Sequence, residues 1–238
     1  MTTTTRHLTD FVKAFKNACK GKTPSQTFDD FLTVIMAFFT KMPKTEFTQY
    51  EKEFSCIRET YRQTGAFDDL LRLPPILFYL LEVKSTHPDI MGDFFLNVID
   101  SEDESFFLAP YDLCLQITEL FSYEAIGTLC VLDTAVKSGR MLIAFSRNSG
   151  ERHKYYGIES NPVLAKLAAV NMFIYGLSGE IVCAGDSDLE NFKTGFRVTM
   201  SPRGIFKIEE KEKSHLWLMR DVFGRMKKDN PQKRLLFL

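Results

Sequence analysis

Long apolar runs are absent from this sequence of 238 residues. No stretch approaches the roughly 20 consecutive apolar residues that a membrane-spanning helix needs. The first ten residues, MTTTTRHLTD, lack the apolar core of a signal peptide. These absences predict a cytoplasmic protein with no membrane partner, and a content of 45% hydrophobic and 26% charged residues is typical of a globular chain.

The sequence also lacks a C-x-x-C pair and a large net charge. The five cysteines form no C-x-x-C pair and lie within or beside apolar runs, which predicts buried thiols rather than disulfides or metal ligands. The formal net charge is only −1, yet residues 201–238 carry ten Lys and Arg against five Asp and Glu. This basic C-terminal segment predicts either a contact with DNA phosphates or a solvated helix face.

The first hundred residues are rich in apolar positions at helical spacing. One such stripe runs from Phe28 to Phe39, and Thr27 followed by Asp30 resembles an N-terminal capping box. We therefore expect a helical region at 1–100, followed by an α/β domain at 101–238.

Two adjacent prolines interrupt a later helical pattern. Proline lacks an N–H donor and disfavours the helix interior. The pair Pro74-Pro75 therefore predicts the end of a short helix that begins at Phe67, with a separate helix over Ile76–Val83.

The stretch 128–187 alternates short apolar runs with amphipathic segments. The runs Leu129–Leu132, Tyr155–Ile158 and Glu180–Ala184 predict strands joined by helices. Two crossovers of this kind imply a parallel sheet with right-handed connections. We thus expect an α/β, Rossmann-like architecture.

Each predicted strand ends in an acid: Asp133, Glu159 and Asp186. One acid at a strand end is ordinary turn chemistry. However, ligands of parallel sheets bind beyond the carboxyl ends of the strands. Three acids in register therefore favour one nucleoside-shaped cavity.

Several motifs in this stretch carry a family resemblance. The run DTAVKSGRML, residues 133–142, resembles the D-P-A-x-G-S-G-x-[ML]-L turn of adenine-N6 DNA methyltransferases, in particular the modification subunits of type I restriction systems. GIE at 157–159, AAVNM at 168–172 and GDS at 185–187 are similar to further motifs of that family. The resemblance implies an S-adenosylmethionine-dependent methyltransferase fold with a mostly parallel sheet, after an N-terminal helical region.

The resemblance also implies a cofactor site for S-adenosylmethionine. In the family the first turn holds the methionine portion, the second acid holds the ribose hydroxyls and the third faces the adenine amine. A segment resembling G-x-[FY]-[FY]-T-P passes under the methionine end. The cofactor-binding residues implied here are Phe107, Ala109, Pro110, Asp133, Ala135, Lys137, Gly139, Glu159, Ser160, Asp186 and Ser187.

Two positions depart from the family pattern in this site. Ala109 replaces a threonine, so one hydroxyl is missing. Lys137 replaces a glycine, which would allow positive φ and close approach of the backbone. Three alternatives stay open for Lys137: its side chain turns outward, pairs with the cofactor carboxylate, or blocks the pocket.

The catalytic motif is poorly matched. The family's [DN]-P-P-[FYW] follows the fourth strand, accepts the adenine amine hydrogens and stacks on a flipped base. We expect the fourth strand at Phe196–Met200, which makes Ser201 and Pro202 the counterparts of the motif and Phe206 the stacking residue. The segment Arg234–Leu238 is expected to add a last strand, and no target-recognition region is expected after it.

Two main functions follow from these observations. The first is an S-adenosylmethionine-dependent adenine-N6 DNA methyltransferase-like protein of a restriction-modification system. The alternative is a catalytically degenerate methyltransferase fold that acts as a DNA- or protein-binding, anti-restriction or regulatory module. The expected partners are DNA and either a second copy or a partner methyltransferase or specificity subunit. Methylation of a small molecule or a protein is a weaker third interpretation.

Overall fold

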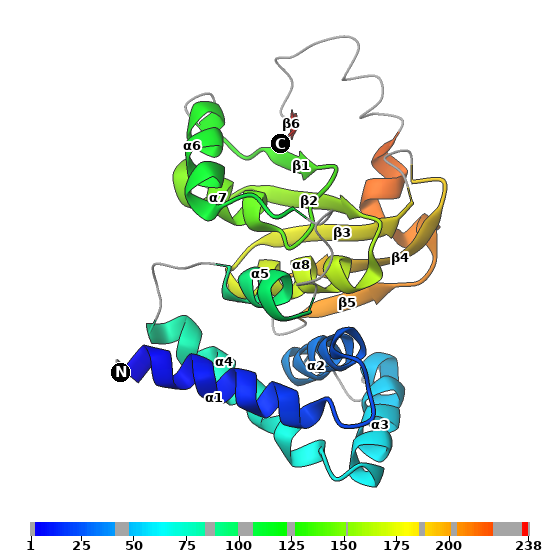
Figure 1. The fold of residues 1–238 in the computed structure, drawn as a ribbon. Coiled ribbons are helices and arrows are strands. Elements are labelled where there is room, and N and C mark those ends of the chain that lie inside the picture. The colour runs from blue at the N-terminus through cyan, green and yellow to red at the C-terminus, as the bar shows by residue number, and fades with distance from the viewer. Residues whose placement is uncertain are drawn as a thin grey trace. The chain divides into compact units, whose positions relative to one another are not determined.

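The computed structural model describes residues 3–40, 48–83, 89–99, 107–122, 127–150, 152–185, 189–200, 204–220 and 235–237. The chain divides into two compact units, Met1–Phe106 and Phe107–Leu238, which we call the helical unit and the α/β unit (Figure 1). Each unit is described by itself. In the described ranges, no helix combines the length and the apolar character needed to cross a membrane.

The helical unit is built around clustered phenylalanine rings. Phe94 lies with its ring centroid 5.0 Å from those of both Phe11 and Phe15, in edge-to-face geometry. Such aromatic pairs are favoured beyond their buried area. The helices that carry this core are α1 (Thr3–Ala18), α2 (Pro24–Phe39), α3 (Thr48–Gln63), α4 (Phe67–Val83), α5 (Ile90–Phe94) and the π-helical turn η1 (Phe95–Ile99).

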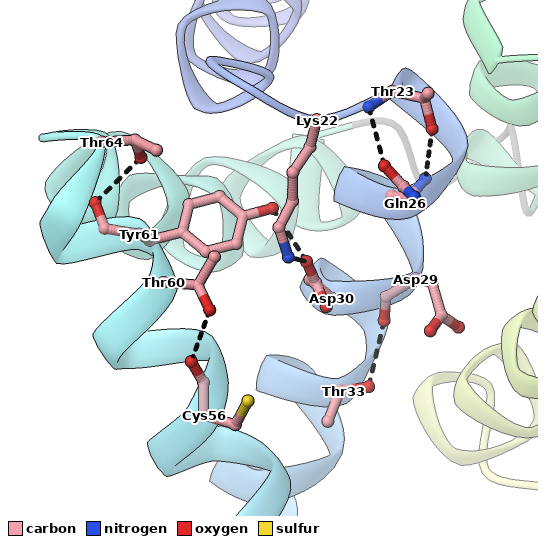
Figure 2. A network of polar contacts seen from close by, with 10 residues as sticks. All are labelled: Lys22, Thr23, Gln26, Asp29, Asp30, Thr33, Cys56, Thr60, Tyr61 and Thr64. Atoms are coloured by element: carbon pink, nitrogen blue, oxygen red, sulfur yellow. Dashed lines mark hydrogen bonds and ion pairs between the residues drawn. The ribbon is translucent and has the colours of Figure 1, made fainter.

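Helix α2 begins earlier than the sequence pattern indicated. Thr23 is the N-cap, and its side chain exchanges capping-box hydrogen bonds with Gln26 (Figure 2). The predicted box of Thr27 with Asp30 is therefore wrong. Asp30 instead accepts a hydrogen bond from Tyr61 Oη at 3.0 Å, so its carboxylate ties α2 to α3.

Helix α4 runs unbroken through Pro74 and Pro75, so the predicted helix break is also wrong. The stripe of buried leucines that includes Leu73 and Leu77 continues on both sides of the proline pair, and α4 packs against α1. Burial of this stripe outweighs the loss of the proline N–H donors.

The α/β unit contains a six-stranded sheet in the order β5-β4-β3-β2-β1-β6. Strands β6, β1, β2 and β3 are mutually parallel, whereas β4 is antiparallel to both β3 and β5. A mostly parallel sheet is thus confirmed. The strands are β1 (Cys130–Asp133), β2 (Lys154–Glu159), β3 (Ser178–Ala184), β4 (Phe192–Val198), β5 (Ile205–Ile208) and β6 (Leu235–Phe237).

Helices cover both faces of this sheet. Helix α7 (Arg140–Ser149) contacts β1, and α8 (Pro162–Ile174) crosses β2, β3 and β4 on the same face (Figure 1). Helix α6 (Tyr111–Ser122) packs on α7. On the opposite face, Leu216 packs into an apolar cluster with Leu132, Tyr156, Ile158, Val182, Ala184 and Leu189.

The cysteine prediction holds only in part. Cys114 and Cys183 are buried, whereas Cys56 is exposed on α3 and the other two are partly exposed. Ile57, which follows Cys56 in the chain, is buried in the core instead, because adjacent helical residues point in different directions.

A fully buried carboxylate anchors the helical segment 215–220 on the opposite face of the sheet. Glu180 in β3 accepts hydrogen bonds from the backbone N–H groups of His215 and Leu216 at 3.1 and 3.2 Å and from the Ser214 hydroxyl. The Arg197 guanidinium of β4 lies 3.2 Å from the same carboxylate. Glu180 therefore satisfies the first donors of the helical segment 215–220.

We predict that Glu180→Gln destabilises the α/β unit by about 3 kcal/mol, because an amide leaves buried donors and Arg197 without the full carboxylate. Glu190→Gln is the matched control. Glu190 is exposed and pairs with Arg220 at 3.8 Å, so its loss is expected to cost at most about 0.5 kcal/mol.

The measurement is urea unfolding followed by the fluorescence of Trp217, the single tryptophan. Its backbone N–H donates to Ser214 Oγ within the Glu180 network. Equal midpoints for the two variants would show that Glu180 does not hold this layer.

Candidate functional site

Two acidic side chains meet at the carboxyl edge of the sheet. Asp133 ends β1 and Glu159 ends β2, and these strands are parallel neighbours with Asp133 in register with Gly157. The two residues are only 6% and 8% exposed. Buried carboxylates are costly unless donors surround them, so their partners define the site.

The turn after β1 is bound to the ends of both strands. The Ala135 N–H donates to Asp133 Oδ1 at 2.9 Å, and the Lys137 N–H donates to Glu159 Oε2 at 2.9 Å. Between them, the Val136 N–H donates to the Ile158 carbonyl at 3.0 Å. The turn is thus fixed by backbone donors on successive residues.

Glu159 also fixes the start of α8. The Asn161 N–H donates to Glu159 Oε1 at 2.9 Å, and the Ser160 hydroxyl lies 3.4 Å from the same oxygen. Asn161 in turn caps α8 through its side chain, with Pro162 in the first turn as predicted. A carboxylate has about four acceptor sites, so Glu159 keeps capacity for further hydroxyl donors.

Lys137 adopts a left-handed conformation, with φ of +49°. Its Nζ donates a hydrogen bond to the Phe107 carbonyl and lies 5.8 Å from the centroid of the Phe107 ring. Among the alternatives left open by the sequence, the side chain therefore turns toward the segment that precedes α6. The conformation itself is the one that glycine adopts most readily.

The segment 107–110 is held beside this turn by a second cation. Arg140, the first residue of α7, is 4% exposed and donates from Nη1 to the Ala109 carbonyl at 2.8 Å. Phe107 is 62% exposed, and Pro110 is also exposed, directly before α6. The predicted residues Phe107, Ala109 and Lys137 are thus brought together.

Residues that shape the turn were matched only as motif letters in the sequence. Asn171 in α8 donates from Nδ2 to the Ser138 carbonyl at 2.8 Å. The asparagine of the A-x-x-N pattern therefore ties the turn to α8. At Gly157, a Cβ would lie 2.7 Å from Ile181 and 2.8 Å from Val136. Only glycine leaves room there for the turn to pack on β2.

Asp133 has an unusual proton affinity. Burial raises its pKa to about 6, and the nearby Glu159 carboxylate adds to the rise, whereas the Ala135 N–H and Lys137 oppose it. Below about pH 6 the neutral carboxyl accepts a hydrogen bond from Ala135 and can donate its own proton, whereas above this pH the side chain is mostly ionised. Among the described residues, no group of three His, Cys, Asp or Glu side chains is arranged to hold a metal ion.

The third predicted acid lies outside the described residues, as does its neighbour: Asp186 and Ser187 are in the undescribed range 186–188. Gly185 is described, and it directly follows Ala184 at the end of β3. Because β3 is parallel to β2, Gly185 lies at the same edge of the sheet as Glu159.

The predicted catalytic segment follows a strand that runs in the opposite direction. Val198, the last residue of β4, pairs with Gly179 at the beginning of β3. The end of β4 is therefore at the amino-terminal edge, away from Asp133 and Glu159. Ser201 and Pro202 lie outside the described residues, and Phe206 is a half-buried residue of β5 in register with Arg197.

The strand that takes the place of a fourth parallel strand is β6. In doubly wound sheets of order 3-2-1-4, the fourth strand lies beside the first, and here β6 is the parallel neighbour of β1. The assignment of Ser201 and Pro202 to a catalytic motif therefore stays a prediction, whereas Phe206 is corrected, because it lies within β5 and pairs with β4.

A comparison of the chain with known protein families gives a match. Residues 88–200 match the family model described as N-6 DNA Methylase. This part of the chain, just under half of its length, is similar to the N-6 DNA methylase family. The match and the sheet order together confirm the predicted fold class and the resemblance found in the sequence. The region therefore has a methyltransferase fold.

A solved structure gives a more distant likeness. The chain is similar to a class I S-adenosylmethionine-dependent methyltransferase of Listeria monocytogenes, with 12% identity and a TM-score of 0.35. The match covers 72% of this chain and 53% of the other, so the chain spans about half the length of that protein. No curated protein matches the chain.

We predict that Asp133→Asn makes the stability of the α/β unit less dependent on pH. The pKa of Asp133 is raised in the folded state, so folding binds a proton between about pH 4 and pH 6 and the wild type loses stability as pH rises through that window. Above it, the variant should be more stable than the wild type by about 2 kcal/mol.

The urea unfolding midpoints of the wild type and the variant, measured at pH 4 and pH 7.5, test this difference in stability. The stabilisation should be present at pH 7.5 and absent at pH 4, since the wild-type carboxyl is neutral at the lower pH. A variant that is destabilised at both pH values would contradict the assigned cause.

Proposed function

We propose that the α/β unit binds S-adenosylmethionine at the carboxyl edge of its sheet and serves N6 methylation of adenine in DNA. The observation that carries this proposal is the turn of residues 134–139, whose backbone is bonded to Asp133 and Glu159 at the ends of two adjacent parallel strands. The family match supports the reaction class.

Each part of the cofactor has a chemically suitable counterpart. With three donors on Glu159, about one of its four acceptor sites remains for a ribose hydroxyl. Backbone groups of the turn, with the segment 107–110 across from them, would surround the methionine portion. Asp186 and Ser187, which follow Gly185 at the same edge, are the proposed partners of the adenine ring.

The bound cofactor would supply a methyl group on a positively charged sulfur. Positioning and exclusion of water are then the main tasks of the chain. The buried edge favours a cationic ligand, because a positive charge near Asp133 lowers the cost of keeping this buried carboxylate ionised. The basic segment 201–238 is the proposed contact with DNA phosphates.

The described end of β4 lies at the edge of the sheet opposite Asp133 and Glu159, since Val198 pairs with Gly179. An acceptor for the adenine amine hydrogens would have to enter the site from the end of β6 or from a second polypeptide, since β6 borders β1. A partner methyltransferase subunit or a second copy of the chain fits this requirement. This is a proposal about assembly as well as chemistry.

The second candidate is a cofactor-binding module without turnover. Two observations favour it. Lys137 occupies a glycine position of the family and contacts Phe107, and no amine acceptor of the [DN]-P-P type is present at the carboxyl edge within the part of the chain that the structure describes. Such a module would act through its surface on DNA or on a methyltransferase partner.

We predict micromolar binding of S-adenosylhomocysteine, equivalent to about −8 kcal/mol. Glu159→Gln should weaken this binding by about tenfold or more, because an amide has one acceptor oxygen where the carboxylate has two. Glu190→Gln, an exposed change in the same unit, is the control and should bind like the wild type. Isothermal titration measures all three, with thermal melts to confirm folding; no binding by folded wild type at millimolar ligand would exclude the cofactor site.

Lys137→Gly tests whether the lysine obstructs the proposed cofactor pocket or supports it. If the lysine obstructs the pocket, the glycine variant should bind S-adenosylhomocysteine about tenfold more tightly; if the lysine holds segment 107–110 in place for the cofactor, binding should weaken.

Transfer of a labelled methyl group to adenine-containing duplex DNA is the companion assay, with DNA already methylated at N6 as the control substrate. Transfer by the unmodified chain supports the enzyme, whereas tight binding without transfer supports the module.

A further inference from the structure

A second cavity lies at the opposite, amino-terminal edge of the sheet. It has a volume of about 660 Å³ and is lined by residues at the beginnings of β2 and β3, among them Lys154 and Ser178, and by Met200 after β4. This volume is within the range of small-molecule sites, roughly 300–1,000 Å³.

This cavity is separate from the proposed cofactor site. Strand β3 spans seven residues between the two edges, which corresponds to about 20 Å at roughly 3.3 Å per residue. No residue that we assign to cofactor binding lines the cavity. Whatever it binds therefore takes no part in contacts at Asp133 and Glu159.

The lining of the cavity is cationic. Arg152 and Lys154 are both exposed, and the described lining contains no Asp or Glu. The hydroxyls of Ser146 and Ser178 add donors. Two cations with hydroxyl donors and no carboxylate form a setting in which an anion is favoured.

His153 also lines the cavity, and its ring orientation is fixed by its contacts. The ring is 3% exposed, and its Nδ1 accepts a hydrogen bond from the Leu129 N–H at 3.1 Å. An accepting Nδ1 places the proton of the neutral ring on Nε2. The ring is held between Phe145 and Tyr155, at centroid distances of 5.5 and 6.1 Å.

The same cavity has an apolar wall. Leu177 is buried, whereas Met200 is 55% exposed, and both line it. Methionine is a flexible surface for flat, polarizable groups. The occupant suggested by the lining is therefore both anionic and partly apolar.

We propose that this cavity binds the phosphate of a nucleotide-sized organic phosphate, with Arg152 and Lys154 at the phosphate and Met200 at the apolar part. Two sources share this chemistry: a free nucleoside phosphate and the backbone of a nucleic acid. The proposal does not depend on S-adenosylmethionine binding.

The test uses thymidine probes, which avoid the adenine moiety of the proposed cofactor. Titration at low ionic strength compares thymidine 5′-monophosphate, thymidine, inorganic phosphate and a short thymidine oligonucleotide. The monophosphate should bind at least about tenfold more tightly than thymidine. Competition by the oligonucleotide would assign the source to a nucleic-acid backbone, and its failure to compete would assign it to a free phosphate.

The double variant Arg152→Gln/Lys154→Gln should weaken binding of the monophosphate by about tenfold or more. The matched control is Arg58→Gln/Lys52→Gln, which removes one exposed Arg and one exposed Lys from α3 in the helical unit. Because the chain has four histidines, the C2-proton resonance of His153 provides a local readout, and it should move on addition of the monophosphate. Equal affinity for monophosphate and thymidine, or equal losses in the two double variants, would overturn the proposal.

Discussion

The carboxylate of Glu159 is the contact on which the proposed site depends. One oxygen accepts from the Lys137 N–H and the other from the Asn161 N–H, both at 2.9 Å. A single side chain at the end of β2 thus joins the turn after β1 to the start of α8. Hydrogen bonds to a buried carboxylate are stronger than those between neutral groups, so the turn has little freedom to move away from the strand ends.

The two buried acids of this edge differ in what surrounds them. Glu159 has backbone donors on both oxygens, whereas Asp133 has the Ala135 N–H as its donor and a pKa raised to about 6. Burial of a carboxylate with fewer donors lowers the stability of the folded protein at neutral pH and makes a nearby positive charge favourable. The arrangement therefore favours a ligand that carries a positive charge near Asp133. The sulfonium group of the proposed cofactor has this charge.

Much of this arrangement could be predicted from the sequence. The apolar runs specify β1, β2 and β3, and the Asn161-Pro162 pair specifies the start of α8, because these depend on neighbours close in the chain. The direction of β4 could not be predicted, since it depends on the connection from Gly185 to Phe192 and on pairing with β3. The assignment of Ser201 and Pro202 to a catalytic motif rested on the direction expected for the strand that precedes them. Continuation of α4 through Pro74 and Pro75 depends on packing against α1, a tertiary effect that local propensity does not contain.

Hydrogen–deuterium exchange with and without S-adenosylhomocysteine tests the central claim most directly. We expect slower exchange of the backbone amides in 134–139 and 159–161, because the ligand would cover the turn and the acid that holds it. Exchange at 152–154, at the opposite edge, should stay unchanged and serves as the internal reference. Protection confined to that opposite edge, or no protection of the turn at saturating ligand, would contradict a cofactor site at Asp133 and Glu159.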